Sequence, residues 1–390
     1  MSALPTSAPA ARAPLGGPGG TAPTRSGPPR APGTPAAAAL LERCRDRVRP
    51  ALVDAVGRLH PWTGEMAAYG LGWADRGGTP DPDGSEGKGV RQTLAVLGAE
   101  AVGADGAVAV PGAVAVELVH TFSLLHDDIM DADALRRRRP AVWKAYGTGP
   151  GVLAGDALLA QAVTVLAEAP GHRTGEAVRN LCRALNDLVS GQAEDLRFEE
   201  RPWRGPGAVR PEQYRSMAEH KTGALLGCAL ALGAILGGAP ERTVATLERA
   251  GRHLGLAFQA VDDLLGVWGD PRVTGKPVHA DLRQGKKTYP ILVALADGGA
   301  AARELGALLD SVGTIDGETA EHAAALVDAA GGRTGTREEA RRHLDAARRT
   351  LREALPGGRG VLPAGSGILA AGRAARELDA LFTHLLDRTW

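Results

Sequence analysis

The chain has few aromatic residues and few cysteines. Phe, Trp and Tyr make up 4% of the 390 residues, so the hydrophobic 44% consists mainly of Ala, Leu and Val. Ala and Leu are strong helix formers, and no alternating run of β-branched residues predicts a strand. The cysteines, Cys44, Cys182 and Cys228, lack pairing or metal-ligand spacing, which is typical of a reducing compartment. These absences predict an all-α, cytoplasmic protein and exclude a disulfide scaffold.

The chain also lacks net charge and a secretory signal. Its 45 basic and 45 acidic residues cancel, so no global field attracts nucleic acid or an anionic membrane. The N-terminus has no charged start followed by an apolar stretch. The segment from Thr222 to Pro240 carries no charge, but its density of Gly and Ala is typical of a tightly packed core helix. We therefore predict no nucleic-acid partner and no integral membrane segment.

Two regions of the chain differ in composition. Residues 1–37 are dominated by Pro, Ala, Gly, Ser and Thr and cannot bury enough apolar surface to offset chain entropy. We predict a disordered N-terminal tail there. From Leu40 onward apolar residues recur at helical spacing, which predicts one helical domain over residues 38–390. Surface loops are expected at Arg76–Gly89, Glu199–Pro211 and Gly357–Gly367.

Two aspartate clusters lie far apart in the chain, and basic residues follow each one. The first holds Asp127, Asp128 and Asp131 before Arg136–Arg139, and the second holds Asp262 and Asp263 before Lys276 and Lys286. Asp127 and Asp131 are four residues apart and would share one face of a helix. Mg²⁺ prefers such oxygen ligands and is commonly shared with substrate phosphates. A solvated acidic patch is the alternative for one cluster alone, but two such clusters favour a site for a metal-bound, highly charged anion.

The aspartate clusters belong to an ordered series of motifs. From Gly87 to Pro290 the series is Gly87–Arg91, Glu117–His120, Asp127–Asp131, Arg136–Pro140, Gly191–Asp195, Lys221-Thr222, Phe258-Gln259, Asp262-Asp263, Gly275-Lys276, Asp281-Leu282 and Gly285–Thr288. In this order and spacing the chain resembles the class I isoprenyl diphosphate synthases, the trans-polyprenyl synthases. The resemblance implies a large single-domain helical bundle with a central cavity, and a homodimer.

The resemblance also implies a reaction. An allylic diphosphate would lose pyrophosphate, isopentenyl diphosphate would attack the allylic cation, and a proton would leave. About three Mg²⁺ ions are expected to bridge the leaving group to the protein. Their expected ligands are Asp127, Asp131 and Asp262, with Asp128 and Asp263 as further candidates.

Basic and polar residues receive roles from the same motifs. Arg136, Lys221 and Lys276 match residues that hold the allylic diphosphate, and Lys286 belongs to the same downstream signature. Lys88, Arg91, His120 and Arg137 match those that hold isopentenyl diphosphate. Thr222 and Gln259 match residues whose oxygens face the developing cation. Arg suits such sites because its planar fork grips phosphate oxygens.

Four positions depart from the family pattern. Gly266 stands where a third Asp of the second cluster is usual, and Gly89 replaces a common Arg or Lys. Arg138 replaces a Gly, and Ala141 replaces a usual Thr. We expect these changes to affect affinity and substrate preference rather than the class of reaction.

Product length is expected to depend on residues just before Asp127. A bulky ring at Phe122, with the small Ser123 beside it, predicts a cavity floor that stops elongation early. The expected product is geranylgeranyl diphosphate ahead of farnesyl diphosphate. The alternative is that Phe122 only packs in the core.

Three further hypotheses concern other functions. Asn186–Glu194 fits the second metal motif of class I terpene cyclases, although its place in the chain is unusual for one. Gly266 and Gly89 are compatible with a non-catalytic regulatory paralogue. The tail resembles N-terminal extensions that load some bacterial polyprenyl synthases into encapsulin shells, so the enzyme would then reside inside such a compartment.

Overall fold

The structure is a computed structural model that describes residues 35–81, 84, 86–274, 277–311, 315–354 and 366–386. Within this part nearly all regular structure is helical, which confirms the all-α prediction. The first helix begins at Pro35, slightly before the predicted start of the helical domain. The predicted tail up to Thr34 and most of the loop predicted at 357–367 lie outside the described residues.

Most of the helices are long. They are α1 (Pro35–Gly57), α2 (Pro61–Leu71), α3 (Val90–Ala101), α4 (Val110–Met130), α6 (Thr148–Ala167), α7 (Thr174–Glu199), α8 (Pro211–Ala218), α9 (Ala224–Leu236), α10 (Glu241–Trp268), α13 (Tyr289–Ala296), α14 (Ala300–Ser311), α15 (Gly317–Ala329), α16 (Gly332–Ala354) and α17 (Ser366–Leu386). The short elements are η1 (Gly106–Ala109), α5 (Val142–Tyr146), η2 (Glu219–Gly223), α11 (Pro271–Thr274), α12 (Ala280–Arg283) and the hairpin β1 (Leu135–Arg136) with β2 (Arg139–Pro140).

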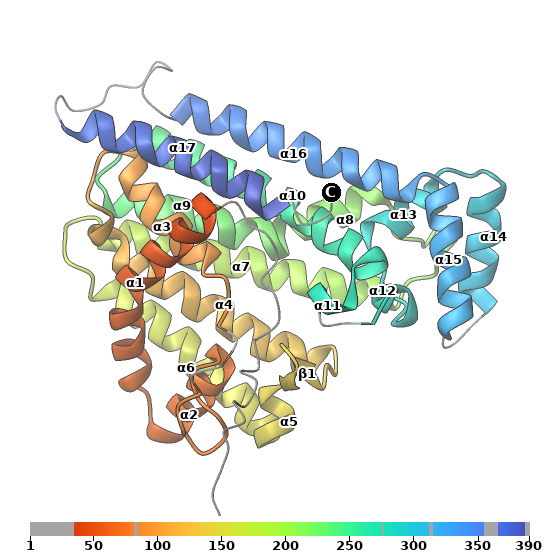
Figure 1. The fold of residues 1–390 in the computed structure, drawn as a ribbon, viewed down its shortest axis with the longest axis horizontal. Helices are drawn as coiled ribbons and strands as arrows, with labels where there is room; N and C mark the ends of the chain where they lie inside the picture. Colours follow the sequence, from red (N-terminus) through yellow and green to blue (C-terminus); the bar gives the residue numbers. More distant parts are fainter. Residues whose placement is uncertain are drawn as a thin grey trace, which may run out of the picture. The chain divides into compact units, whose positions relative to one another are not determined.

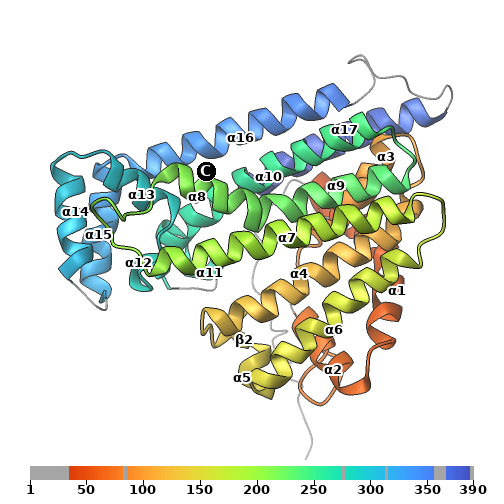
Figure 2. The same cartoon turned by 180° about the vertical axis from the view of Figure 1, so that it is seen from behind.

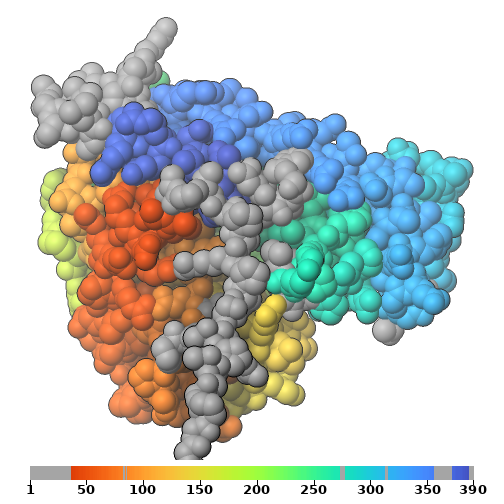
Figure 3. Space-filling view, in the orientation of Figure 1, coloured from red at the N-terminus to blue at the C-terminus, as the bar shows by residue number. Residues whose placement is uncertain are grey.

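The long helices pack side by side. Helix α10 packs most extensively against α16 and α9, α4 packs against α6, and α3 packs against α9 (Figures 1 and 2). Helix α17 packs against α3 and α1 (Figure 3), and Arg43 of α1 bridges Glu100 of α3 and Glu377 of α17 at 2.8 Å each. The loops predicted at 76–89 and 199–211 do connect α2 to α3 and α7 to α8. The hairpin was not predicted, because its strands have only two residues each.

Small residues allow the central helices to approach closely. Every residue of α9 except its last is buried, which confirms the predicted core helix. A Cβ added to Gly255 of α10 would lie 2.5 Å from Cα of Gly223. Backbone at that distance cannot move aside as a flexible side chain would. The density of Gly in this region therefore reflects close contact between helices.

We expect Gly255→Ala to lower the free energy of unfolding by about 1–3 kcal/mol, because overpacking forces two helices apart. Urea denaturation measures the effect. Gly149→Ala is a matched control, since an added Cβ there meets nothing within 4 Å. The control should be neutral or slightly stabilising. Equal losses at the two positions would contradict the close-packing argument.

Two described helical stretches, Gly106–Met130 and Thr148–Ala167, are long and apolar enough to cross a membrane by length and composition alone. In the first, 67% of the most apolar window is buried inside the protein, and in the second 39% is buried. The core helix of a soluble protein passes the same test, so these helices are weak evidence for a membrane segment.

Candidate active site

The first aspartate cluster lies at the C-terminal end of α4. Asp128 is 1% exposed and accepts a bidentate pair of hydrogen bonds from Arg136, with Nε and Nη2 at 2.8 and 2.6 Å. Asp131 follows the last residue of α4 and pairs with Lys286 at 2.8 Å. Lys286 lies 155 residues further along the chain. The structure thus brings a downstream basic residue to the first cluster.

Asp127 lies between these pairs and is partly buried. Burial raises the pKa of its carboxyl to about 6; the Asp131 charge adds to the increase, and Lys221 opposes it. An ionised carboxylate is therefore costly here unless a cation binds it. Such a site favours a bound cation at neutral pH.

Helix α7 brings further carboxylates to the same place. Asp195 pairs with Lys221 at 2.6 Å, and Glu199 lies four residues further along the same face. Burial raises the pKa of Glu199, and the charges of Asp131 and Asp195 raise it further. Neither carboxylate was among the predicted site residues. Asp195 belongs to a quoted motif, so only Glu199 lacked a signal in the sequence.

The two aspartates of the second cluster, Asp262 and Asp263, lie in different environments. Asp263 is 2% exposed, and its carboxylate accepts hydrogen bonds from Gln259 Nε2 at 2.9 Å and from the Tyr289 N–H at 3.1 Å. Burial raises the pKa of Asp263 to about 7, against the effect of its hydrogen-bond donors. Asp262 is partly exposed, and its charge acts on Arg91. Protein donors therefore occupy Asp263, whereas the charge of Asp262 acts on Arg91, a residue predicted to hold isopentenyl diphosphate.

The donor set fits magnesium shared with a substrate. Among residues in the described ranges, no three His, Cys, Asp or Glu side chains form a group that could hold an ion by themselves. Mg²⁺ commonly uses one or two carboxylates and takes its other ligands from water and phosphate. Because burial raises the pKa of Asp127, a bound cation would stabilise its ionised form.

The side chain of Asp281 occupies the space beside Gly266. A Cβ at this position of α10 would overlap the carboxylate of Asp281, which comes from α12. The charge of Asp281 also raises the pKa of both Asp263 and Lys286. A carboxylate is therefore present beside the second cluster, but it is supplied by a different helix.

A second group of cations lies around Glu117 of α4. Glu117 is 7% exposed; burial raises its pKa, and the charges of Arg91, Arg137 and Arg45 oppose that increase. His120 keeps part of its surface accessible, and burial together with the charge of Arg91 lowers its pKa well below the ordinary value. Glu117 therefore offsets the charge of these cations; it belongs to one of the motifs but was not among the predicted site residues.

The loop before α3 joins this group. A Cβ on Gly87 would lie 2.9 Å from Nη2 of Arg137, and Lys88 is exposed beside it. Gly89 has φ of 67°, and an added Cβ there would overlap Gln92. Glycine adopts this left-handed conformation at no steric cost. The missing Arg or Lys at Gly89 is thus a consequence of backbone geometry.

The β1–β2 hairpin turns at Arg137 and Arg138, with φ of 51° and 65°. Positive φ at both central residues is the signature of a type I′ turn, which usually takes Gly or Asn. Arg138 therefore adopts a conformation that the usual Gly would adopt without strain. The turn places Arg136 on Asp128 and Arg137 toward Glu117.

Thr222 and Gln259 contact each other. The Thr222 hydroxyl donates to Gln259 Oε1 at 2.7 Å. Thr222 lies in the π-helical turn η2, which the sequence did not predict. Gln192 of α7 is 7% exposed, and its side-chain amide makes no hydrogen bond within the described residues. Lys276 lies outside the described residues.

Phe122 is 8% exposed and packs edge-on against His126, with ring centroids 4.8 Å apart. The Ser123 hydroxyl donates to the His120 carbonyl at 2.9 Å. The motif of the terpene-cyclase alternative fits less well, because Asn186 and Ser190 are exposed on α7. Asp195, in contrast, pairs with Lys221 at the site.

Comparisons with known proteins agree with this geometry. The Polyprenyl synthetase family model matches residues 84–327. The chain is 44% identical to a (2E,6E)-farnesyl diphosphate synthase of Mycobacterium bovis over 308 residues, covering 78% of this chain and 84% of the relative. It is 46% identical to a geranylgeranyl diphosphate synthase of Mycobacterium tuberculosis over 297 residues, covering 75% and 83%.

A solved polyprenyl synthetase from Streptomyces coelicolor A3(2) has the same fold. Its TM-score is 0.80 at 47% identity, covering 89% of this chain and 99% of that chain. Nothing in these comparisons supports the terpene cyclase or the regulatory paralogue. The chain therefore belongs to the polyprenyl synthetase family, the class I trans-isoprenyl diphosphate synthases, which are transferases.

Proposed function

We propose that this chain condenses isopentenyl diphosphate with an allylic diphosphate, and that geranylgeranyl diphosphate is its main product. The observation that carries the proposal is the convergence of Asp127, Asp131 and Asp195 with Lys221 and Lys286. The named relatives include short-chain synthases of farnesyl and of geranylgeranyl diphosphate at similar identity. The proposal of geranylgeranyl diphosphate as the product therefore rests on Phe122, the predicted floor of the cavity.

The departing pyrophosphate needs positive charge on all sides. Bound Mg²⁺, held by Asp127, Asp131 and Asp262, would neutralise the leaving group. Burial lowers the pKa of Lys221, but the charges of Asp195 and Asp127 outweigh this effect and raise the pKa. Lys221 therefore stays protonated and binds phosphate oxygens, as do Arg136 and Lys286.

Isopentenyl diphosphate would bind nearer the middle of α4, beside Glu117 and His120. Arg91, Arg137 and Lys88 would grip its diphosphate, with His120 as a neutral hydrogen-bonding partner because its pKa is lowered. The double bond then attacks the allylic cation, and the released pyrophosphate accepts the proton. Thr222 and Gln259 direct oxygen atoms at the cation while it exists.

One assay tests the function. Purified protein is incubated with Mg²⁺, isopentenyl diphosphate and each short allylic primer, and the products are extracted and sized. Geranylgeranyl diphosphate as the main product would support the proposal. Hydrocarbons formed from geranylgeranyl diphosphate alone would indicate a cyclase, and no turnover with any primer would favour a regulatory paralogue.

We expect Phe122→Ala to shift the products to longer chains, because the ring would floor the cavity below Asp127. Product sizing from the same assay is the measurement. Phe382→Ala is the control, since Phe382 is fully buried on α17, which packs mainly against α1, α3, α10 and α16. It should lower stability without changing chain length. Unchanged products from Phe122→Ala would refute the floor role.

We propose that the protein forms a homodimer through exposed apolar residues of α6 and α7. Val152 and Leu153 of α6 and Val189 of α7 are exposed by 39%, 50% and 56%, and both helices are visible together in Figure 2. Leu153→Asp is expected to weaken dimerisation at least about tenfold, or about 1.4 kcal/mol, by light scattering on a dilution series. Val53→Asp on α1, also exposed, should not. A dimer unaffected by Leu153→Asp would exclude this surface.

Residues 1–37 are proposed to dock the enzyme in an encapsulin shell within the cytoplasm. Deleting them and testing co-purification with a shell protein measures this. Full retention of the truncated enzyme would reject the docking role.

A further inference from the structure

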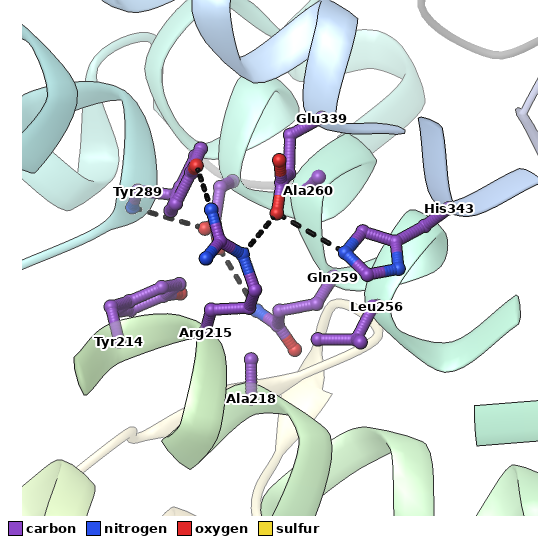
Figure 4. A pocket seen from close by; sticks show the side chains of 10 residues that line it. Tyr214, Arg215, Ala218, Leu256, Gln259, Ala260, Tyr289, Glu339 and His343 are labelled. Carbon is purple, nitrogen blue, oxygen red and sulfur yellow. Dashed lines mark hydrogen bonds and ion pairs between the residues drawn. The ribbon is translucent and has the colours of Figure 1, made fainter. Parts of the chain in front are cut away.

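A second polar cluster lies beside α10 and extends to α16. Its pocket is lined by Tyr214 and Arg215 of α8, Tyr289 of α13, and Glu339 and His343 of α16 (Figure 4). Glu339 is 4% exposed and accepts hydrogen bonds from Arg215, Arg342 and His343. A carboxylate buried this deeply is stable only with such donors.

Two sets of hydrogen bonds, joined through the covalent frame of Tyr289, connect Glu339 to Asp263 and Gln259. Arg215 Nε donates to Glu339 Oε1 at 2.5 Å, and Arg215 Nη2 donates to the Tyr289 hydroxyl at 3.1 Å. The Tyr289 N–H donates to Asp263 at 3.1 Å. Figure 4 shows these side chains converging between α8, α13 and α16.

The second set of hydrogen bonds ends at the amide of Gln259. Its Nε2 donates to Asp263 at 2.9 Å, and its Oε1 accepts from Thr222 at 2.7 Å. In its ionised form the Asp263 carboxylate accepts hydrogen bonds and donates none. Asp263 therefore selects the NH₂ group of Gln259 and leaves the carbonyl oxygen on the Thr222 side. The orientation of the Gln259 dipole depends on where Asp263 is held.

Tyr289 connects the two halves. Its backbone N–H is the first of α13 and points at Asp263, while its hydroxyl is held by Arg215. The N-terminus of a helix stabilises a carboxylate through its unpaired N–H groups and its dipole. Fixing the hydroxyl of Tyr289 therefore also restrains one of the donors that orient Asp263, and the Tyr214 hydroxyl is another.

We propose that Glu339 and Arg215 are positioning residues for prenyl transfer. They anchor Tyr289, which holds Asp263, so that the Gln259 carbonyl faces the allylic cation. This role rests on the proposed function. The alternative is that the Arg215–Glu339 pair only attaches α16 to α8.

The test compares Glu339→Gln, Arg215→Gln and the double variant by steady-state kinetics with both diphosphates. An interaction made only as the cation develops affects kcat and leaves KM unchanged. We expect each single variant to lose about tenfold in kcat, with little change in KM. The double variant should lose no more than either single variant, because residues acting in one series are not additive.

Two variants separate positioning from stability. Tyr289→Phe removes only the hydroxyl and should reproduce the kcat loss even if a Glu339 variant folds poorly. Asp379→Asn breaks the ion pair of Arg348 with Asp379 at 2.7 Å, which joins α16 to α17, and should leave kcat unchanged. Thermal unfolding of every variant is recorded beside the kinetics.

The outcomes are distinct. Wild-type protein without condensation activity would overturn both the proposed function and the positioning role. An active wild type with unchanged kcat in the variants, additive losses, or a rise in KM alone would overturn only the positioning role.

Discussion

Asp127→Asn is expected to lower kcat by roughly 10²–10³-fold, the usual loss when one group that stabilises transition-state charge is removed. Asn keeps the size of the side chain but cannot neutralise a cation. The substitution should also raise the Mg²⁺ concentration needed for half-maximal rate. Asp54→Asn on α1, where the carboxylate is 73% exposed, should behave as wild type. A variant with wild-type kcat and wild-type Mg²⁺ dependence would exclude Asp127 as a ligand.

In the absence of metal, the same substitution should raise the stability of the protein at neutral pH, although it lowers activity. The folded-state pKa of Asp127 is about 6, above its ordinary value of 3.8, so the folded wild type binds more protons than the unfolded chain between these values. Wild-type stability therefore falls as pH rises through this window. With EDTA present, Asp127→Asn should gain stability over wild type at pH 7 and lose that advantage near pH 4. Thermal unfolding at the two pH values measures the difference, and an equal difference at both would contradict the burial argument.

Features set by residues close together in the sequence were predicted better than contacts between residues far apart in it. Asp127 and Asp131 were predicted to share one helix face from spacing alone; Asp127 lies in the last turn of α4, and Asp131 follows its final residue, Met130. The core helix α9 was predicted from composition. The ordered motifs identified the family, and the comparisons confirmed it.

The counter-charges were harder to predict. Helix packing brings Glu117 near Arg91 and Arg137, and it brings Glu199 near Asp131. Local periodicity does not reveal this packing. The π-helical turn at Lys221 and Thr222 depends on tight contact with α7, where a Cβ on Gly191 would overlap the Lys221 backbone. Such contacts join residues far apart in sequence, so they appear only once the helices are placed.

Gly266→Asp tests the contact between Gly266 and Asp281, which the sequence alone did not predict. The substitution restores the usual third aspartate, yet we expect it to lower the free energy of unfolding by about 1 kcal/mol, the low end for overpacking, because the Asp281 side chain has to move aside. The new Cβ would overlap the Asp281 carboxylate. Two carboxylates forced together also repel, so one would have to take up a proton.

Activity should fall with stability in Gly266→Asp. The backbone N–H of Lys286 donates to the Asp281 carbonyl at 2.9 Å, and Lys286 pairs with Asp131. Displacing Asp281 therefore moves a cation away from the first cluster. We expect a loss of about tenfold or more in kcat, measured beside urea denaturation.

The double variant Gly266→Asp/Asp281→Gly should recover stability and part of the activity, because it moves the carboxylate from α12 to α10 without the overlap. Gly266→Ala distinguishes steric overlap from charge repulsion, because its Cβ overlaps Asp281 but brings no second carboxylate. Coupling between positions 266 and 281 is the expected signature of direct contact. If Gly266→Asp is as stable and as active as wild type, or if Asp281→Gly does not rescue it, then the space beside α10 is not filled by Asp281, and the missing aspartate of the second cluster requires another explanation.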